Sequence, residues 1–209
     1  MHFVTVTTSA GVNPRPTGRY KIFLFDLDST VTKEEILPTI AKEIGKGEEM
    51  RILTESVMMG EVPFADSFKA RVKILQEIPV SKMAKRIKNI ALSTKIVEFI
   101  KKNKEACYIV TGNLDVWIKE LIKKIGLEDH LYCSNAFIKN DQIVNIEKIL
   151  SKEAPIEDFK NKTIIAIGDG SNDYELLKNA DIGIGYGGVR NIAPCLFDVC
   201  DYAVYDENK

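Results

Sequence analysis

The sequence has few cysteines, no long apolar run and no excess of charge of either sign. Its four cysteines include no CxxC pair, and a chain of 209 residues needs no disulfide framework to fold. We therefore expect reduced thiols and a cytoplasmic protein. No apolar run approaches the roughly 20 residues that cross a bilayer, so no membrane partner is expected. The four cysteines are Cys107, Cys133, Cys195 and Cys200.

Opposite charges almost cancel in this chain. It has 29 Lys and Arg against 30 Asp and Glu, for a formal net charge of −1, and neither sign dominates a long segment. A nucleic-acid partner would call for a basic stripe or patch, so none is expected. A small molecule is the simpler partner, and the chain is expected to be a monomer or homodimer.

Residues 1–19 form an N-terminal extension ahead of the first clear strand. They lack the apolar segment of a secretory signal. The alternation of apolar and polar residues over 3–7 favours an extra edge strand or tail over a targeting helix.

Short, unbroken apolar runs recur along the chain, and they are typical of strands covered on both faces, as in a parallel sheet. Between two of them, residues 114–125 place apolar side chains on one helical stripe that ends at Gly126. Strand, helix, strand is the βαβ rhythm of a doubly wound α/β fold. The apolar runs lie at 20–25, 106–110, 163–167, 182–186 and 202–205.

Two interruptions break this rhythm. Residues 136–145 carry two apolar runs on either side of Asn140-Asp141, which predicts a β-hairpin. Residues 33–91 show successive amphipathic patterns with no strand between them, and glycine and proline breakers divide them into four helices. This helical segment follows the first strand directly, so we expect it to lie as a cap over the end of that strand. The breakers are Gly45, Gly47, Gly60, Pro63 and Pro79.

Polar residues follow three of the apolar runs, in "FLFDLDST", "YIVTGN" and "IAIGDGSND". The carboxyl ends of parallel strands meet at one edge of the sheet, where α/β folds bind ligands. Each residue alone fits a helix cap or turn equally well, but three such strand ends in one chain favour a common site. The converging residues are Asp26, Asp28, Thr30, Thr111, Asn113, Asp169, Asn172 and Asp173.

Four aspartates brought together need shared protons or a cation, because unit charges 4 Å apart repel by about 4 kcal/mol at an effective dielectric constant near 20. Oxygen ligands without nearby His or Cys indicate a hard cation. A site that combines a few carboxylates with water and phosphate suits Mg²⁺ better than Ca²⁺.

With these motifs the chain resembles the haloacid dehalogenase superfamily of phosphohydrolases. The superfamily pattern DxDx[ST] is matched by residues 26–30, the strand-final Thr or Ser by Thr111, and the last motif by "GDGSND". The resemblance implies a Rossmannoid, doubly wound parallel sheet with a small helical cap inserted after the first strand. The implied division is an extension at 1–19, a core at 20–32 and 92–209, and a cap at 33–91.

The helical insertion is similar to that of the phosphoserine phosphatase subfamily. The subfamily glutamate matches Glu35, a cap methionine matches Met58, and the Phe-x6-Arg helix matches Phe64 and Arg71. Independently, Arg71 lies on the helix face of Phe64 and Phe68, where an unpaired guanidinium is costly, so it should meet an anion. That anion is a substrate carboxylate or Glu35. In the first case Glu35 is free to take a substrate ammonium.

The resemblance also implies roles for the remaining site residues. Asp26 is the nucleophile, and Asp28 protonates the leaving alcohol and then deprotonates water. The implied ligands of Mg²⁺ are Asp26, Asp169, the backbone carbonyl of Asp28 and, through water, Asp173. The phosphate is implied to bind Thr111, Gly112 and a lysine. The sequence spacing between this lysine and Asp169 favours Lys148 over Lys152. The expected substrate-binding set is Glu35, Met58, Phe64, Arg71, Thr111, Gly112, Lys148 and Asn172.

Departures from the subfamily leave the substrate open. Asn113 replaces a glycine, and "GIGYGGVRNIAP" replaces a small residue followed by Lys-Pro. O-phosphoserine is the first expectation, and a phosphorylated aminoalcohol or phosphosugar is the alternative. A non-catalytic phospho-receiver domain is a third reading, but receivers lack both a counterpart of Asp28 and an inserted cap.

Overall fold

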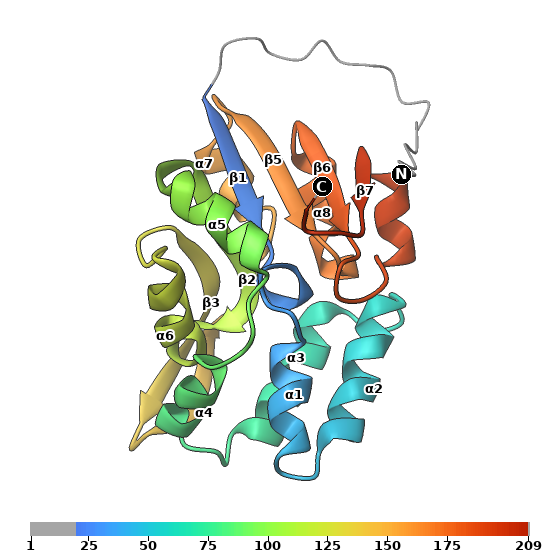
Figure 1. Cartoon of the computed structure of the whole chain (residues 1–209). Coiled ribbons are helices and arrows are strands. Elements are labelled where there is room, and N and C mark those ends of the chain that lie inside the picture. The colour runs from blue at the N-terminus through green and yellow to red at the C-terminus, as the bar shows by residue number, and fades with distance from the viewer. Residues whose placement is uncertain (1–19, 209) are drawn as a thin grey trace.

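A computed structural model describes residues 20–208 of the chain. The strand expected at 3–7 and the extension at 1–19 lie outside the described residues. The predicted α/β class is confirmed: a seven-stranded sheet has helices on both faces (Figure 1). Its strands are β1 (Lys21–Phe25), β2 (Cys107–Leu114), β3 (Leu131–Lys139), β4 (Gln142–Lys148), β5 (Thr163–Gly168), β6 (Ile182–Tyr186) and β7 (Tyr202–Val204).

The strand order is β4-β3-β2-β1-β5-β6-β7, and β4 alone runs antiparallel to its neighbour. The first strand, β1, lies at the centre of the sheet. The next strands, β2 and β3, are added on one side of it, and β5 is then added on its other side. This reversal of direction is a topological switch point, and ligands bind at the carboxyl ends of strands beside such a point.

The two faces of the sheet carry separate cores because side chains alternate along each strand. On one face Phe25 packs with Trp117 and other residues of α5 (Thr94–Lys102) and α6 (Asp115–Ile125). On the other, Leu24 packs with residues of α7 (Ala154–Asp158), α8 (Tyr174–Asn179) and η4 (Pro194–Asp198). Helix α6 ends at Gly126 with φ of 89°, as its apolar stripe predicts. Both faces of β1 are thus covered, which holds its carboxyl end rigidly.

The predicted hairpin is formed by β3 and β4. Asn140 and Asp141 have φ of 52° and 64°, as a two-residue type I′ turn requires. Asp141 also reaches the start of α4, where its carbonyl accepts the N–H of Val80 at 2.8 Å and its carboxylate accepts the N–H of Ser81 at 2.9 Å. The hairpin therefore supports the helical segment.

Four α-helices lie within residues 33–91, as the breaker pattern predicts, and α5 completes the connection from β1 to β2. Helices α1, α2 and α3 gather beyond the carboxyl end of the sheet, while α4 packs along α6 as well as α1 (Figure 1). Their apolar faces meet in an interior that includes Ile36, Met50, Phe68 and Leu75. The helices are α1 (Ile36–Lys42), α2 (Gly47–Met58), α3 (Phe64–Leu75) and α4 (Val80–Ile87).

The two connections to this helical segment run side by side. Thr32 and Leu92 form an antiparallel bridge, and the N–H of Lys33 donates to the carbonyl of Ala91 at 2.8 Å. The outgoing connection follows η1 (Leu27–Val31), an irregular turn after β1, and the returning connection leads into α5. The division into a core and a cap at 33–91 remains our proposal.

In the part of the chain that the structure describes, no helix is long and apolar enough to span a membrane.

Candidate active site

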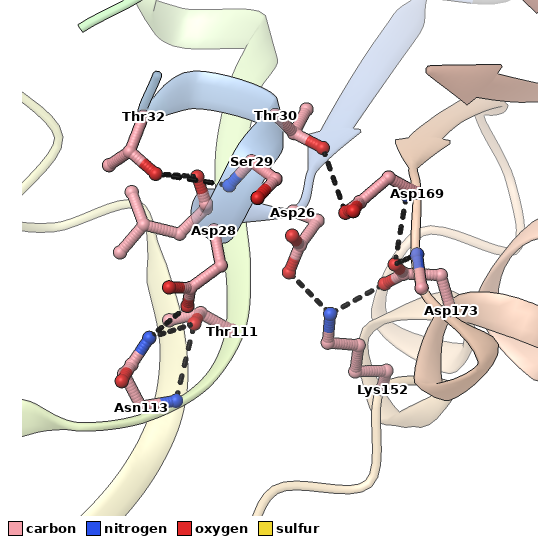
Figure 2. A network of polar contacts seen from close by, with 12 residues as sticks. Asp26, Asp28, Ser29, Thr30, Thr32, Thr111, Asn113, Lys152, Asp169 and Asp173 are labelled. Carbon is pink, nitrogen blue, oxygen red and sulfur yellow. Dashed lines mark hydrogen bonds and ion pairs between the residues drawn. The ribbon is translucent and has the colours of Figure 1, made fainter. Parts of the chain in front are cut away.

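Three buried carboxylates lie at the switch point. Asp26 follows β1, Asp169 follows β5, and the two strands are tied there by a 2.8 Å hydrogen bond from the N–H of Asp26 to the carbonyl of Ile167. Asp173 comes from the short helix η3 (Ser171–Asp173). One oxygen from each carboxylate lies within 4.8 Å of the others (Figure 2). The convergence that the sequence predicts is therefore present.

Backbone geometry holds Asp173 in this cluster. Its carboxylate accepts the N–H groups of Asp169 at 3.2 Å and Gly170 at 3.0 Å. A Cβ on Gly168 would lie 2.5 Å from Cγ of Asp173, so only glycine leaves room for this approach.

Lys152 is the lysine of the site. Its buried ammonium contacts Asp26 and lies 2.5 Å from Asp173 (Figure 2). Burial opposes its charge, but Asp173 and Asp26 outweigh this effect and raise the pKa of Lys152 above its ordinary value.

The prediction of Lys148 is wrong. Lys148 ends β4, the edge strand of the sheet, where it is exposed to solvent. The chain then returns toward the carboxyl ends of the central strands before α7, and Lys152 lies on this return. Lys152 lies 17 residues before Asp169, closer in sequence than the superfamily spacing suggests, and the helix between them, α7, has 5 residues.

Asp28 lies outside the carboxylate cluster, in η1, and its carboxylate is held on both oxygens. Oδ1 accepts the N–H of Ile36 at 2.8 Å, and Oδ2 accepts a hydrogen bond from the side-chain amide of Asn113 (Figure 2). Burial and the nearby Glu35 raise the pKa of Asp28 to about 6, although these two hydrogen bonds oppose the shift. The carboxyl can therefore hold or release a proton near neutral pH.

A pocket opens between these residues and the helical segment. It contains Asp26 and Asp28 together with most of the residues predicted to bind substrate. Of the adjacent Glu34 and Glu35, it is Glu35 that lines the pocket. The predicted substrate-binding residues that line it are Glu35, Met58, Phe64, Arg71, Thr111, Gly112 and Asn172.

Gly112 and Phe64 form a close contact between the sheet and the helices at this pocket. A Cβ on Gly112 would lie 2.2 Å from the ring of Phe64. The aromatic ring therefore rests directly on the backbone after Thr111, which fixes how closely α3 approaches β2.

Arg71 is buried in the pocket wall with a free hydrogen-bonding group. Its guanidinium carbon lies 5.5 Å from the ring centroid of Phe64 and 5.8 Å from that of Phe68. Within residues 20–208 the buried Nε of Arg71 has no hydrogen-bond partner, and burial lowers the pKa of this side chain. Among the described residues Glu35 pairs with Arg190 rather than with Arg71.

Sequence reasoning missed Arg190. This residue follows β6 in the loop that departs from the superfamily pattern, and the loop is tied to the site by a 2.8 Å hydrogen bond from the N–H of Ala193 to the carbonyl of Asp169. The guanidinium contacts the carboxylates of both Asp169 and Glu35. The only available signal was the unusual "GGVRN" segment.

Negative charge exceeds positive charge here. Five carboxylates (Asp26, Asp28, Glu35, Asp169 and Asp173) face three cations, Arg71, Lys152 and Arg190. Burial raises the pKa of Asp26 well above its ordinary value despite Lys152, and burial raises the pKa of Asp169 to about 7 despite Arg190. A buried, oxygen-only cluster with excess negative charge fits a hard divalent cation.

Comparison with known proteins agrees with this geometry. A family model described as haloacid dehalogenase-like hydrolase matches residues 23–178, and a second model of the same description matches residues 154–209. The chain belongs to the haloacid dehalogenase-like hydrolases.

Within this family the chain is similar to phosphoserine phosphatases. It is 32% identical over 180 residues to the phosphoserine phosphatase of Methanocaldococcus jannaschii, covering 79% of this chain and 85% of the relative. It is 30% identical to that of Archaeoglobus fulgidus, covering 90% of this chain and 57% of the relative. The solved phospho-aspartyl intermediate analogue of a phosphoserine phosphatase has a TM-score of 0.74 at 27% identity, covering 90% of this chain and 94% of that one. The resemblance read from the motifs is confirmed.

Proposed function

We propose that this protein is a Mg²⁺-dependent phosphomonoesterase that hydrolyses O-phosphoserine through a phosphorylated Asp26. The observation that carries the proposal is the meeting of Asp26, Asp169 and Asp173 beside Lys152 at the switch point, under a pocket that also contains Asp28. Similarity to phosphoserine phosphatases across most of the chain supports the substrate.

The first step transfers the phosphoryl group. A carboxylate oxygen of Asp26 forms a bond to phosphorus as the bond from phosphorus to the serine oxygen breaks, and Asp28 gives its proton to that oxygen. In the second step Asp28 takes a proton from water, the water oxygen attacks phosphorus, and the bond to Asp26 breaks to release phosphate. The raised pKa of Asp28, about 6, suits a group that must give and regain a proton.

Charge on the phosphoryl oxygens needs fixed donors. Thr111 and the backbone at Gly112 line the pocket, and Lys152 contacts the nucleophile. Mg²⁺ would be held by Asp26, Asp169, the backbone carbonyl of Asp28 and Asp173. When bound it neutralises charge on the carboxylates and the phosphoryl group.

The remaining wall of the pocket recognises the serine portion. The buried and unpaired Nε of Arg71 supports the reading that its guanidinium receives the substrate carboxylate. The pocket residues Met58, Phe64 and Asn172 enclose the rest of the molecule. The four cysteines are all free thiols, which supports a cytoplasmic location.

Phosphate release from a panel of phosphate esters, with and without Mg²⁺, tests this function. O-phosphoserine should be hydrolysed only with Mg²⁺, and Asp26→Asn should be inactive. Arg71→Met should lower kcat/KM for O-phosphoserine by about tenfold or more, because a charged hydrogen bond is lost. If a phosphorylated aminoalcohol or a phosphosugar is preferred, the substrate is the alternative one. Absence of phosphate release from every ester would contradict the proposal and would favour a non-catalytic phospho-receiver domain.

A further inference from the structure

Arg190 lies where the pocket would otherwise present a free carboxylate to the substrate. Its Nη1 contacts Glu35 and its Nε contacts Asp169, so the guanidinium joins the start of α1 to the end of β5. Glu35 also accepts a hydrogen bond from the hydroxyl of Ser29 at 3.2 Å. The negative charge of Glu35 is thus already matched by an internal cation.

The position of Arg190 is fixed by the fold. The loop that carries it is bound at both ends: the N–H of Gly187 donates to Val204 at 2.7 Å and the N–H of Ala193 donates to Asp169 at 2.8 Å. The side chain of Arg190 is only 25% exposed and lines the pocket. Moving Arg190 out of the pocket must therefore break contacts with two carboxylates.

Arg71 and Arg190 together change what the pocket recognises. Both guanidiniums line it, and Glu35 is the acidic group on the same wall that would otherwise meet a substrate ammonium. An ammonium brought to Glu35 would approach Arg190 and compete with it. A carboxylate, in contrast, meets Arg71 without losing an existing ion pair.

We propose that Arg190 is a specificity-determining residue that occupies Glu35, so that the pocket selects phosphate esters bearing a carboxylate and gains little from an amino group. This inference rests on the proposed function and deepens it. The substrate class widens from O-phosphoserine to short phosphorylated hydroxy acids.

The test compares O-phosphoserine with its counterpart that lacks the amino group, the phosphate ester of 3-hydroxypropanoate. Dissociation constants are measured by calorimetry with Mg²⁺ in Asp26→Asn, which keeps both ligands intact. We expect the two constants to agree within about threefold. Adding Arg190→Met frees Glu35 and should make O-phosphoserine bind at least about tenfold better than its counterpart, as expected for one charged hydrogen bond. Arg190→Lys should give an intermediate ratio.

A matched control is Arg86→Met in the same background, because Arg86 pairs with Glu43 on the exposed side of the helices. It should leave the ratio unchanged. A general loss of folding or of metal affinity would weaken both ligands together and would not move the ratio. The Glu35→Gln change should abolish the discrimination gained in Arg190→Met and do little when Arg190 is present.

Two results would overturn the inference. One is at least tenfold preference for O-phosphoserine with Arg190 present and no change in Arg190→Met. The other is failure of both ligands to bind any variant. Failure of the proposed function appears separately, as absence of phosphate release by the protein with Asp26 intact, because the binding ratio needs no turnover.

Discussion

Asp26 is surrounded by charges of both signs, and this arrangement governs its chemistry. Burial and the neighbouring Asp173 and Asp169 favour the neutral carboxyl, whereas Lys152 favours the ionised form that can attack phosphorus. In the proposed mechanism the ammonium of Lys152 therefore helps to keep Asp26 ionised for its attack on phosphorus.

Replacing Lys152 should be far more damaging than replacing Lys148. We expect Lys152→Met to lower kcat/KM by about a hundredfold, because a fixed cation beside the transferred phosphoryl group is lost. Lys148→Met should stay within about twofold of the unmodified protein, since the side chain is exposed on the edge strand. Steady-state phosphate release measures both, and circular dichroism confirms folding. Equal losses would contradict the assignment.

Sequence reasoning predicted the aspartates, named Lys152 only as the alternative to Lys148, and missed Arg190. Asp26 and Asp169 could be found because each follows a buried strand, and parallel strands bring their carboxyl ends together. Lys152 and Arg190 lie in loops, whose paths depend on tertiary packing. Spacing from a family pattern placed the lysine four residues too early, because it assumes a connection length that this chain does not have.

At the scale of elements, α3 meets β2 through the contact of Phe64 with Gly112. This contact limits how closely α3 approaches the carboxyl-terminal part of β2. The sequence showed Phe64 and Gly112 only as two separate matches to the family. Their direct contact could not be predicted, because it depends on how α3 packs above β2.

Gly112→Ala should weaken substrate binding. The added methyl would lie 2.2 Å from the ring of Phe64, so α3 must shift or the ring must turn. We expect kcat/KM to fall by about tenfold, in the range of an overpacked contact of about 1–3 kcal/mol. The double variant with Phe64→Ala should cost less than the sum of the two single changes, because both act on one contact. Additive losses in phosphate release would contradict this coupling.

The elements themselves were largely predictable. Apolar runs predicted the strands, Asn140-Asp141 predicted the hairpin turn, and the breakers predicted the four helices of residues 33–91. The packing of α4 along α6 was not predictable, because an amphipathic stripe shows which face is buried but not its partner.

At the scale of the whole molecule, the excess negative charge at the switch point should make folding sensitive to Mg²⁺. A cation that binds only the folded chain adds about 2.7 kcal/mol at a hundredfold excess over its dissociation constant. For a chain of this size the melting temperature should then rise by about 5–10 °C. Asp169→Asn should largely remove the rise in a calorimetric scan. An equal rise in this variant would place the cation elsewhere.

Burial should protect two thiols, that of Cys107 in the core and that of the partly buried Cys133. Burial raises the pKa of Cys107 to about 12 and that of Cys133 to about 12, so almost no reactive thiolate forms at pH 8. We expect alkylation at these positions to be at least about a hundredfold slower in the folded protein than in urea, and to rise with pH well above pH 9. Peptide mapping after timed alkylation measures each site. Rapid labelling of Cys107 in the folded state would contradict this burial.

The central claim is that the switch point presents Asp26 as a nucleophile to a phosphate ester. The most direct measurement is acid quenching during turnover of O-phosphoserine, followed by mass spectrometry of the peptide that contains Asp26. The account predicts a transient phosphoryl group on Asp26 that is absent in Asp26→Asn. Turnover with no phosphorylated Asp26, or with the phosphoryl group on another residue, would contradict it.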